Sequence, residues 1–470
     1  MLGGIWRGRV KSEQSRPMTQ APPTAQPATP RRGVLLTSFE PSGDDHASAV
    51  IAELKRRHPD LVVYAWGGPK MERAGAVLVE RTGENAVMGM PGLGKILEHI
   101  RLNRRVRKWL REHAAPAGPV VAHIPVDSPA ANFPICKIAK GFGLKVVHLV
   151  APQVWAWGRW RIKKLRRLTD FVLCLLPFEE NWFITRGVQA RFVGHPLFDE
   201  PLDYAELDRR AAEIERRVRA SLGETHGVTS SGARPPLRLA LMPGSRPAEY
   251  RGCFPVLLDA FERLRKDFPN VTGVVAATKP SVAEEMFAMA AARAGEPGTE
   301  DPEARRARRN KAAAQAASGE PERPGWPAGL EMVSGDTDAV VRWCDFALVV
   351  SGTVTLQIAR QSKPMVAFYR PNPLVYWLAA RWLVSTEFFT LPNLIAGRRI
   401  LPELIPHFGD GEALAVEVIK LLRREGYADD QRAELAKVCE LFGGRVAAHD
   451  AAEQIERVLG LDKPRSIGAG

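Results

Sequence analysis

The residues best suited to chemistry stand directly after short apolar runs. Asp127 follows the run VVAHIPV, and Pro125 and Pro129 stiffen the turn around it. A carboxylate in this position can accept a proton from a hydroxyl nucleophile if burial raises its pKa from about 3.9. The structural alternative for Asp127 is a helix N-cap.

A second junction is LLTSFEPSGDDH at 35–46, which contains Glu40, Ser42, Gly43 and Asp44. Gly43 permits the backbone to approach a ligand closely. In the structural alternative, Ser42 or Asp44 caps the following helix. The stretch is not a GxGxxG motif, and no acidic residue follows at the spacing that a dinucleotide ribose needs, which argues against a nicotinamide cofactor.

Two small-residue turns in the second half of the chain suit an anion. Backbone amides at such turns, helped by a neighbouring arginine, bind phosphate groups. Two anion sites together favour a nucleotide diphosphate. The residues are Gly244, Ser245, Arg246 and Glu249 in LALMPGSRPAEY, and Ser351, Gly352, Thr353 and Gln357 in LVVSGTVTLQIA.

Two further stretches carry polar or aromatic residues inside apolar surroundings. In TLPNLIAGRRILPEL, Asn393 and Glu403 need buried partners, which a sugar, a base or the loop's own backbone can provide. In VAPQVWAWGRWRIKKLRR at 150–167, Gln153, Trp155 and Trp157 precede six basic residues in nine. The tryptophans suit either an active-site lip or the core, and the cations suit a phosphate or an anionic lipid.

The elements that position these residues alternate between apolar strands and amphipathic helices. Continuous apolar runs are typical of parallel strands covered on both faces. We therefore predict an α/β protein with two doubly wound, Rossmann-like domains facing a cleft, because ligands of such sheets bind where strands end.

The expected organisation has a disordered tail at 1–32, a first domain at 33–205 and a second at 236–405, followed by helices at 406–460. A charged, linker-like segment from about 200 to 236 separates the domains, and 291–327 is a polar, Pro- and Gly-rich insertion in the second.

Composition sets further limits on function. A net charge of +13 favours polyanionic partners, whether nucleic acid, an anionic membrane or phosphorylated substrates. The five cysteines form no CxxC pair, so a zinc site and a disulfide framework are both unexpected. No apolar stretch reaches the ~20 residues of a membrane span, and the first residues lack the apolar region of a secretory signal.

Taken together, the junctions resemble the lipid-A-disaccharide synthase family, which has the GT-B fold. The resemblance covers about 33–460, apart from the insertion. The stretches that carry it occur in the family's order: EPSGDDH, GGPKMERAG, AVMGM, VDSPAANF, HLVAPQVWAW, LLPFEENWF, FVGHPL, LMPGSRPAE, VVSGTVTLQ, MVAFYR and FFTLPNLIAGRRILPEL.

The resemblance implies that 2,3-diacylglucosamine passes from its UDP donor to 2,3-diacylglucosamine 1-phosphate, with inversion and without a metal or cofactor. Asp127 would be the base, and Arg246 with the SGT turn would bind the UDP leaving group. On the acceptor side we expect Glu40, Ser42, Gly43, Asp44, Met88 of AVMGM, Gln153, Trp155 and Trp157.

Two positions depart from the family pattern. Gln357 stands where the family usually has a ribose-binding glutamate, which puts donor affinity in doubt. Ala130 replaces a second carboxylate near Asp127, which puts the rate or the exact substrate in doubt.

Lipid substrates imply a cytoplasmic protein, peripheral on the inner face of the cytoplasmic membrane of a Gram-negative-type bacterium, and allow a homodimer. Residues 369–384 suit an interfacial or a core helix, and 101–112 a helix that meets either headgroups or solvent. Nucleic acid is not expected. The alternatives are a soluble UDP-sugar transferase or UDP-N-acetylglucosamine epimerase of the same fold, and a non-catalytic basic binding protein.

Overall fold

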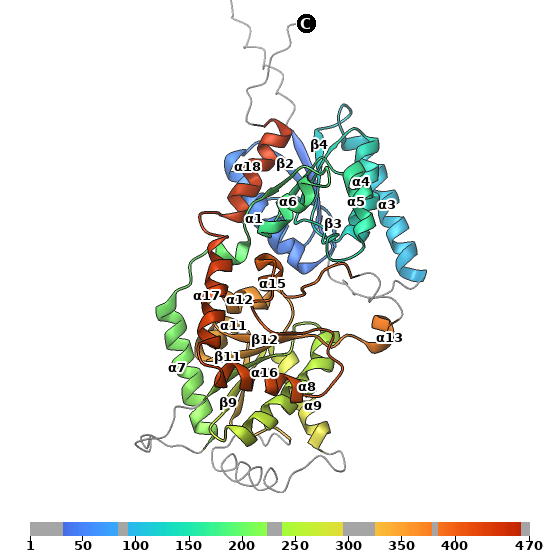
Figure 1. Ribbon diagram of the computed structural model, residues 1–470. Coiled ribbons are helices and arrows are strands. Elements are labelled where there is room, and N and C mark those ends of the chain that lie inside the picture. Colours follow the sequence, from blue (N-terminus) through green and yellow to red (C-terminus); the bar gives the residue numbers. More distant parts are fainter. Residues whose placement is uncertain (1–31, 83–92, 223–236, 295–324, 378–383, 462–470) are drawn as a thin grey trace, which may run out of the picture.

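The computed structural model describes residues 32–82, 93–222, 237–294, 325–377 and 384–461, and contains two parallel β-sheets that stack end to end in the molecule (Figure 1). The predicted 1–32 tail, apart from Arg32, and most of the 291–327 insertion lie outside these ranges. The prediction of an α/β fold with two doubly wound sheets and a helical C-terminus is confirmed.

The first sheet has seven strands in the order β3-β2-β1-β4-β5-β6-β7, all parallel. Six of them lie on apolar runs that the sequence predicts as strands, whereas β3 was not predicted; these runs are GVLLTSF, LVVYAWG, VVAHIPV, LKVVHLVAP, FVLCLLP and ARFVGHP. The strands are β1 (Gly33–Thr37), β2 (Val62–Gly67), β3 (Val77–Arg81), β4 (Val120–Pro125), β5 (Lys145–Leu149), β6 (Phe171–Cys174) and β7 (Ala190–Phe192).

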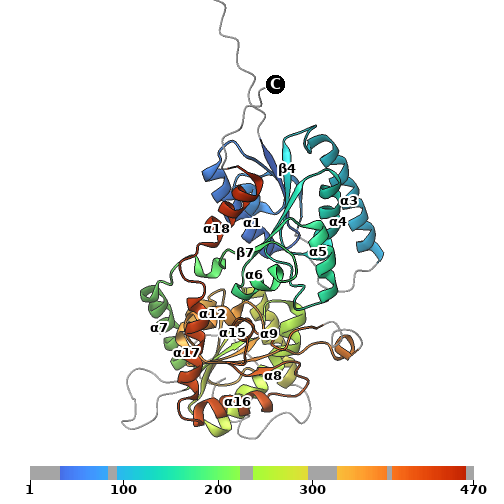
Figure 2. The ribbon, with the colours of Figure 1, turned by 45° about the horizontal axis from the view of Figure 1, so that its top comes forward.

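Helices cover both faces of this sheet because alternate strand residues are apolar on each side. Val34 and Leu36 face the core under α1 (Pro41–Arg57), whereas Leu35 faces the core under α3 (Leu93–His113) and α4 (Pro129–Gly141). Both views show α3, α4 and α5 (Ile162–Leu168) together on one side (Figure 2). The remaining helices are α2 (Pro69–Arg73), η1 (Arg159–Arg161), α6 (Pro177–Ile184) and η2 (Pro196–Phe198).

The second sheet has six parallel strands in the order β10-β9-β8-β11-β12-β13. The strands are β8 (Arg238–Met242), β9 (Thr272–Ala277), β10 (Leu330–Ser334), β11 (Phe346–Val350), β12 (Met365–Phe368) and β13 (Glu403–Leu404). Its helices are α8 (Pro247–Asp267), α9 (Pro280–Ala294), α11 (Thr337–Trp343), α12 (Val354–Arg360), α13 (Pro373–Val375), α15 (Leu391–Ala396), α16 (Glu412–Arg423) and α17 (Tyr427–Glu440).

The segment expected to be a charged linker contains a packed helix, α7 (Tyr204–Ser221). Its buried Ile214 and Val218 join the core of the second half, and Glu215 accepts a 2.7 Å hydrogen bond from the Trp343 indole. The charges misled the prediction, because an amphipathic helix is also charged on its solvent face.

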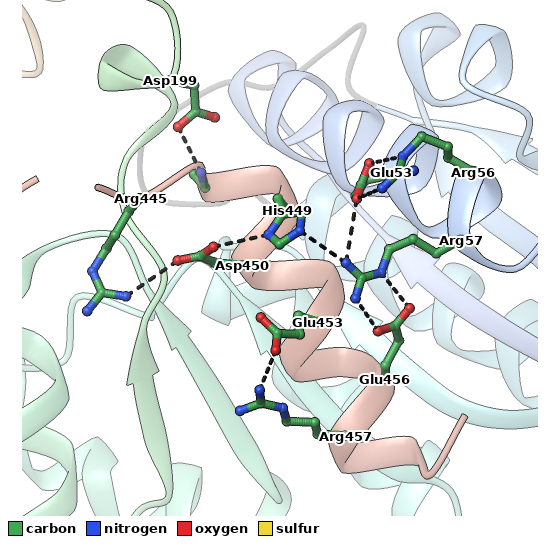
Figure 3. Close-up of polar contacts among 11 residues, drawn as sticks. Glu53, Arg56, Arg57, Asp199, Arg445, His449, Asp450, Glu453, Glu456 and Arg457 are labelled. Atoms are coloured by element: carbon green, nitrogen blue, oxygen red, sulfur yellow. Dashed lines mark hydrogen bonds and ion pairs between the residues drawn. The ribbon is translucent and has the colours of Figure 1, made fainter. Parts of the chain in front are cut away.

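The last helix, α18 (Ala447–Leu459), returns to the first half and packs against α1 (Figure 3). Glu456, 6% exposed, accepts two 2.7 Å hydrogen bonds from the Arg57 guanidinium and contacts His58 Nε2 at 2.6 Å. The C-terminal helices expected at 406–460 therefore serve both halves: α16 and α17 cover the second sheet and α18 covers the first.

Two membrane-related segments differ in how they pack. In α3, Leu102, Val106 and Leu110 are buried against the sheet while its arginines face outward. Residues 369–384 do not form a core helix in their described part, since α13 is short and Leu374 and Trp377 are exposed. No helix within the described ranges is long and apolar enough to cross a bilayer.

Candidate active site

Asp127 lies in a strained turn between β4 and α4. Asp127 and Ser128 adopt φ values of 43° and 42°, which are costly for residues with a side chain. Ser128 occupies the N-cap position of α4 but makes no side-chain cap. The turn therefore presents the Asp127 side chain at the carboxyl edge of the first sheet, at a cost that neighbouring contacts must offset.

A buried polar network holds this turn in place. The Asn132 amide donates to the carbonyls of Val126 at 3.1 Å and Asp127 at 2.7 Å. Its oxygen accepts a 2.6 Å bond from the Thr37 hydroxyl, which in turn lies 2.8 Å from His123 Nε2. Because the hydroxyl donates to Asn132, it must accept from His123, so Nε2 carries a proton. Burial favours the neutral imidazole, because it lowers the pKa of His123 to about 3.

The Asp127 carboxyl combines the properties expected of a general base. Burial raises its pKa above the ordinary value, and the negative charge of Glu40 raises it further. Glu40 is held nearby by a 2.7 Å hydrogen bond from the Ser128 hydroxyl. Arg246, from the second half of the chain, acts in the opposite direction and lowers the pKa. Glu40 and Arg246 therefore act on the pKa of Asp127 in opposite directions.

Glu179 is a buried carboxyl near this site that the sequence analysis did not single out. It accepts a 2.8 Å hydrogen bond from the Trp155 indole and a 3.0 Å bond from the Leu176 amide. Burial raises its pKa to about 7, and the charge of Asp127 adds to that shift. The sequence did contain a signal for Glu179. The stretch LLPFEE directly follows β6 at a strand-to-helix junction, as VDSP directly follows β4.

The EPSGDDH stretch is organised differently from the predicted helix cap. Neither Ser42 nor Asp44 caps α1, whose N-cap position is Glu40. Asp44 is buried and accepts hydrogen bonds from the amides of Gly68, Lys70 and Met71, so it anchors the start of α2 instead. This prediction was wrong because a carboxylate can reach across to another helix whose amides are free.

Gly43 and Ser42, in the same stretch, differ in the space around them. Gly43 is buried, and a Cβ added to it would come within 2.4 Å of the Ser38 hydroxyl, so no side chain fits without movement. Ser42 is exposed at the first turn of α1. The backbone at Gly43 therefore lies close to Ser38 and leaves no room for a side chain. Ser42, in contrast, is accessible to a ligand.

In the Pro243–Arg246 turn, a side chain of the protein already satisfies the amides predicted to bind phosphate. Glu249 accepts from the backbone N–H groups of Ser245 at 3.1 Å and Arg246 at 3.2 Å. It also forms a 2.9 Å ion pair with the Arg246 guanidinium. Gly244, at φ 98°, allows the turn, and a Cβ there would meet Glu249 at 2.8 Å. The Arg246 side chain is 54% exposed and is accessible to an anion.

The SGT turn is open to solvent. No atom lies within 4 Å of a Cβ built on Gly352, and both Gly352 and Thr353 are exposed. Ser351 is fixed by a 2.9 Å hydrogen bond from its hydroxyl to the Phe389 carbonyl. Gln357 is half-buried on α12, one turn beyond Thr353. These positions present polar groups that a ligand can reach.

Asn393 and Glu403, in contrast, bond within their own loop. Asn393 is fully buried, donates to the Leu401 carbonyl at 3.0 Å and accepts from the Ile400 amide at 2.7 Å. Glu403 accepts from the amide and hydroxyl of Thr390 at 2.7 and 2.5 Å. The structural alternative, hydrogen bonding to the loop's own backbone, accounts for both.

The aromatic stretch after β5 divides between core and interface. Trp155 is buried at 5% exposure, whereas Trp157 is 42% exposed and pairs in a β-bridge with Val384 of the second half. The Ser385 amide donates to the Ala156 carbonyl at 2.9 Å. Gln153 is exposed beside them. Met88 lies outside the described residues.

The sequence matches one family model along most of its length. The model, Lipid-A-disaccharide synthetase, matches residues 34–319 and 328–456. The chain belongs to the lipid-A-disaccharide synthase family. Its members include the Lipid-A-disaccharide synthase of Geobacter sulfurreducens, 30% identical over 91% of this chain and 97% of that protein. The Pseudomonas putida protein of the same name is 34% identical over 91% of this chain and 98% of its own.

Solved structures agree with the GT-B fold at low sequence identity. The S. aureus MnaA–UDP co-structure gives a TM-score of 0.52 at 11% identity, covering 93% of this chain and all of that one. A glycotransferase of kitacinnamycin gives 0.52 at 14% identity, covering 92% of this chain and all of that one. The family match favours lipid-A-disaccharide synthase over the alternative UDP-sugar enzymes and over a non-catalytic binding protein.

Proposed function

We propose that this protein transfers 2,3-diacylglucosamine from its UDP donor to 2,3-diacylglucosamine 1-phosphate, giving the lipid A disaccharide 1-phosphate and UDP. The observation that carries the proposal is the buried Asp127 carboxyl at the carboxyl end of β4, whose pKa is raised by burial and lowered by the charge of Arg246 from the second half. It is supported by the family match and by relatives named for this activity. The donor is a sugar nucleotide, and the acceptor is a glycolipid.

In the proposed reaction Asp127 acts as the general base. Its carboxylate takes the proton of the acceptor's 6-hydroxyl while that oxygen attacks the anomeric carbon of the donor. The bond from that carbon to the diphosphate breaks, and UDP leaves with the electron pair. One in-line displacement inverts the anomeric configuration. The raised pKa of Asp127 brings it closer to the working pH, which makes it a more effective base.

The second half would stabilise the leaving group. The exposed guanidinium of Arg246 can pair with the negative charge that develops on the diphosphate. The open SGT turn offers further donors at Gly352 and Thr353. Because Glu249 already holds the amides of Ser245 and Arg246, we expect the guanidinium rather than those amides to contact the phosphates.

The proposal extends to partners and location. Donor and acceptor both carry acyl chains, so the protein would act at the inner face of the cytoplasmic membrane, with the exposed arginines of α3 and the apolar Leu374 and Trp377 nearest the lipid. The transfer would need neither metal nor cofactor. A homodimer is compatible with the proposal.

The decisive experiment supplies UDP-2,3-diacylglucosamine and the acceptor phosphate in detergent micelles and measures UDP release together with disaccharide formation. We expect turnover in the presence of a chelator. Asp127→Asn should lower kcat by at least ~10³-fold, and Arg246→Ala should lower kcat/KM for the donor by ~10²-fold. The exposed Arg423→Ala serves as a control. Absence of UDP release from the unmodified protein would reject the proposal.

A further inference from the structure

A cavity of about 500 Å³ opens on the first half of the molecule. It is lined by both cationic and aromatic side chains, a combination suited to the phosphate of a ligand that also carries an apolar or sugar part. Its walls are Phe133 of α4 together with Trp160, Arg161, Lys163, Lys164 and Arg167 of η1 and α5.

The cations of this cavity have no anionic partner in the described part of the chain. Elsewhere, arginines on amphipathic helices pair with glutamates one turn away, as Arg219 of α7 pairs with Glu215 at 2.8 Å. Here Lys164 lies 5.0 Å from the centre of the Phe133 ring, and Arg161 donates to the Trp157 carbonyl at 2.5 Å. Neither contact neutralises a charge.

The position of Arg161, Lys163 and Lys164, at the start of α5, is also unfavourable for the helix itself. No acidic residue occupies the first turn of η1 or α5, where negative charge would complement the helix dipole. Burial further disfavours the charged form of Arg161 and lowers its pKa. A bound anion would offset all of these costs at once.

The elements that line the cavity begin at the same sheet edge as Asp127. The loops after β4 and β5 both leave from the carboxyl end of the parallel sheet and lead into α4 and into η1 and α5. Helix α4 begins two residues after Asp127, and Phe133 lies four residues further, a rise of ~6 Å. Trp157 and Arg159, just before the cavity, contact Val384 and Ser385 of the second half.

We propose that this cavity binds the phosphate of the acceptor glycolipid. The inference rests on the proposed function, because the 6-hydroxyl that Asp127 would activate and the 1-phosphate lie at opposite ends of the same sugar ring. The acceptor phosphate therefore needs a site about one sugar ring away from Asp127, and the cations of this cavity belong to the same half as Asp127. The UDP phosphates are assigned to the second half, so they do not compete for this cavity.

The test measures equilibrium binding of the acceptor phosphate alone, which needs no transfer. The probes are 2,3-diacylglucosamine 1-phosphate and the same glycolipid without the phosphate, in neutral detergent micelles. The triple variant Lys163→Ala, Lys164→Ala, Arg167→Ala should raise the Kd of the phosphorylated probe at least ~10-fold and leave the other within ~2-fold. The control Lys420→Ala, Arg423→Ala, Lys437→Ala removes the same charge from exposed positions of α16 and α17 and should change neither.

The outcomes separate the possible sources of the anion. Equal loss for both probes, or no loss, would overturn the proposal. Weakened binding to phosphatidylglycerol vesicles with unchanged affinity for the micellar acceptor would assign the cavity to a phospholipid headgroup instead and would also overturn it. If phosphate-dependent binding is found but no UDP is released when the donor is added, the cavity assignment stands and the proposed reaction fails.

Discussion

The chemistry of Asp127 depends on its immediate neighbours. Burial raises its pKa most, and Glu40 adds to that effect. A base works only when deprotonated, so kcat should fall as the pH decreases through this raised pKa. Glu40→Gln removes a negative charge and should move the acidic limb of the pH–rate profile to lower pH.

A matched variant isolates the charge of Glu40 from its hydrogen bond. Ser128→Ala removes the 2.7 Å bond to Glu40 but keeps its carboxylate, so the acidic limb should move less than in Glu40→Gln. The measurement is kcat against pH with saturating substrates. A limb that stays in place or moves to higher pH in Glu40→Gln would show that Glu40 does not act on the base.

Glu179 gives a prediction about stability rather than rate. Its pKa rises from an ordinary 4.5 to about 7 on folding, because burial penalises the charged form. The folded state therefore binds the proton more tightly, and this group's contribution to the free energy of unfolding decreases as the pH rises between those values. The total loss is up to ~3 kcal/mol.

The variant Glu179→Gln should flatten this dependence, because an amide does not titrate and still accepts from the Trp155 indole. The check is the urea midpoint of each protein at several pH values from 4.5 to 7. The exposed Glu284→Gln is the control and should retain the slope. An unchanged slope in Glu179→Gln would mean that other groups cause it.

At the scale of single residues, the sequence shows which side chains could do chemistry. It does not show which of them are free to contact a ligand. Asp127 stands where the strand pattern placed it, because a strand end is visible in the sequence. Asn393 and Glu403 looked equally suited to a ligand, yet Ile400, Leu401 and Thr390 take up their hydrogen-bonding capacity. Such partners become neighbours only when the loop closes, so local sequence cannot reveal them.

At the scale of elements, the β4–α4 turn depends on Asn132. Replacing it with alanine removes the donors to the Val126 and Asp127 carbonyls and leaves Thr37 without its acceptor. Asn132→Ala should lower the free energy of unfolding by ~2 kcal/mol and kcat by ~10-fold or more. UDP affinity, a property of the second half, should stay unchanged. A loss of UDP affinity equal to the loss of kcat would indicate general disruption instead.

The α1–α18 contact offers a second test at this scale. Arg57→Ala leaves the nearly buried Glu456 carboxylate with only His58 of the two partners described above and should lower stability by ~2 kcal/mol, measured by urea unfolding. Its neighbour Arg56 pairs with Glu53 at the surface, so Arg56→Ala should have no measurable effect. Equal effects of the two variants would show that the α18 contact adds nothing.

Strands were predicted correctly from the sequence where helices cover both faces of the sheet. Strands such as FVLCLLP are covered on both faces and read as apolar runs, whereas β3 reads VLVER, lies at the sheet edge and is mostly half-exposed. Strand β13 has two residues and depends on pairing with β12. The return of α18 to the first half also carries no local signal, since its apolar face would suit either sheet.

At the scale of the whole molecule, the two halves meet through the segment around Trp157 and Ser385, and each half carries one of the residues assigned to the reaction, Asp127 or Arg246. A ligand that binds the folded protein shifts the unfolding equilibrium in proportion to its affinity. UDP at about 100 times its Kd should therefore stabilise the protein by ~2.7 kcal/mol and raise its Tm.

The same measurement separates binding from catalysis across the molecule. Arg246→Ala should lose most of the UDP-dependent rise in Tm, because its guanidinium is the exposed cation assigned to the phosphates. Asp127→Asn should keep the full rise, since its carboxyl belongs to the other half and is needed only for proton transfer. If both variants lost the UDP-dependent rise in Tm equally, UDP binding would depend on both halves together. The assignment of UDP binding to the second half and of proton transfer to the first would then be wrong.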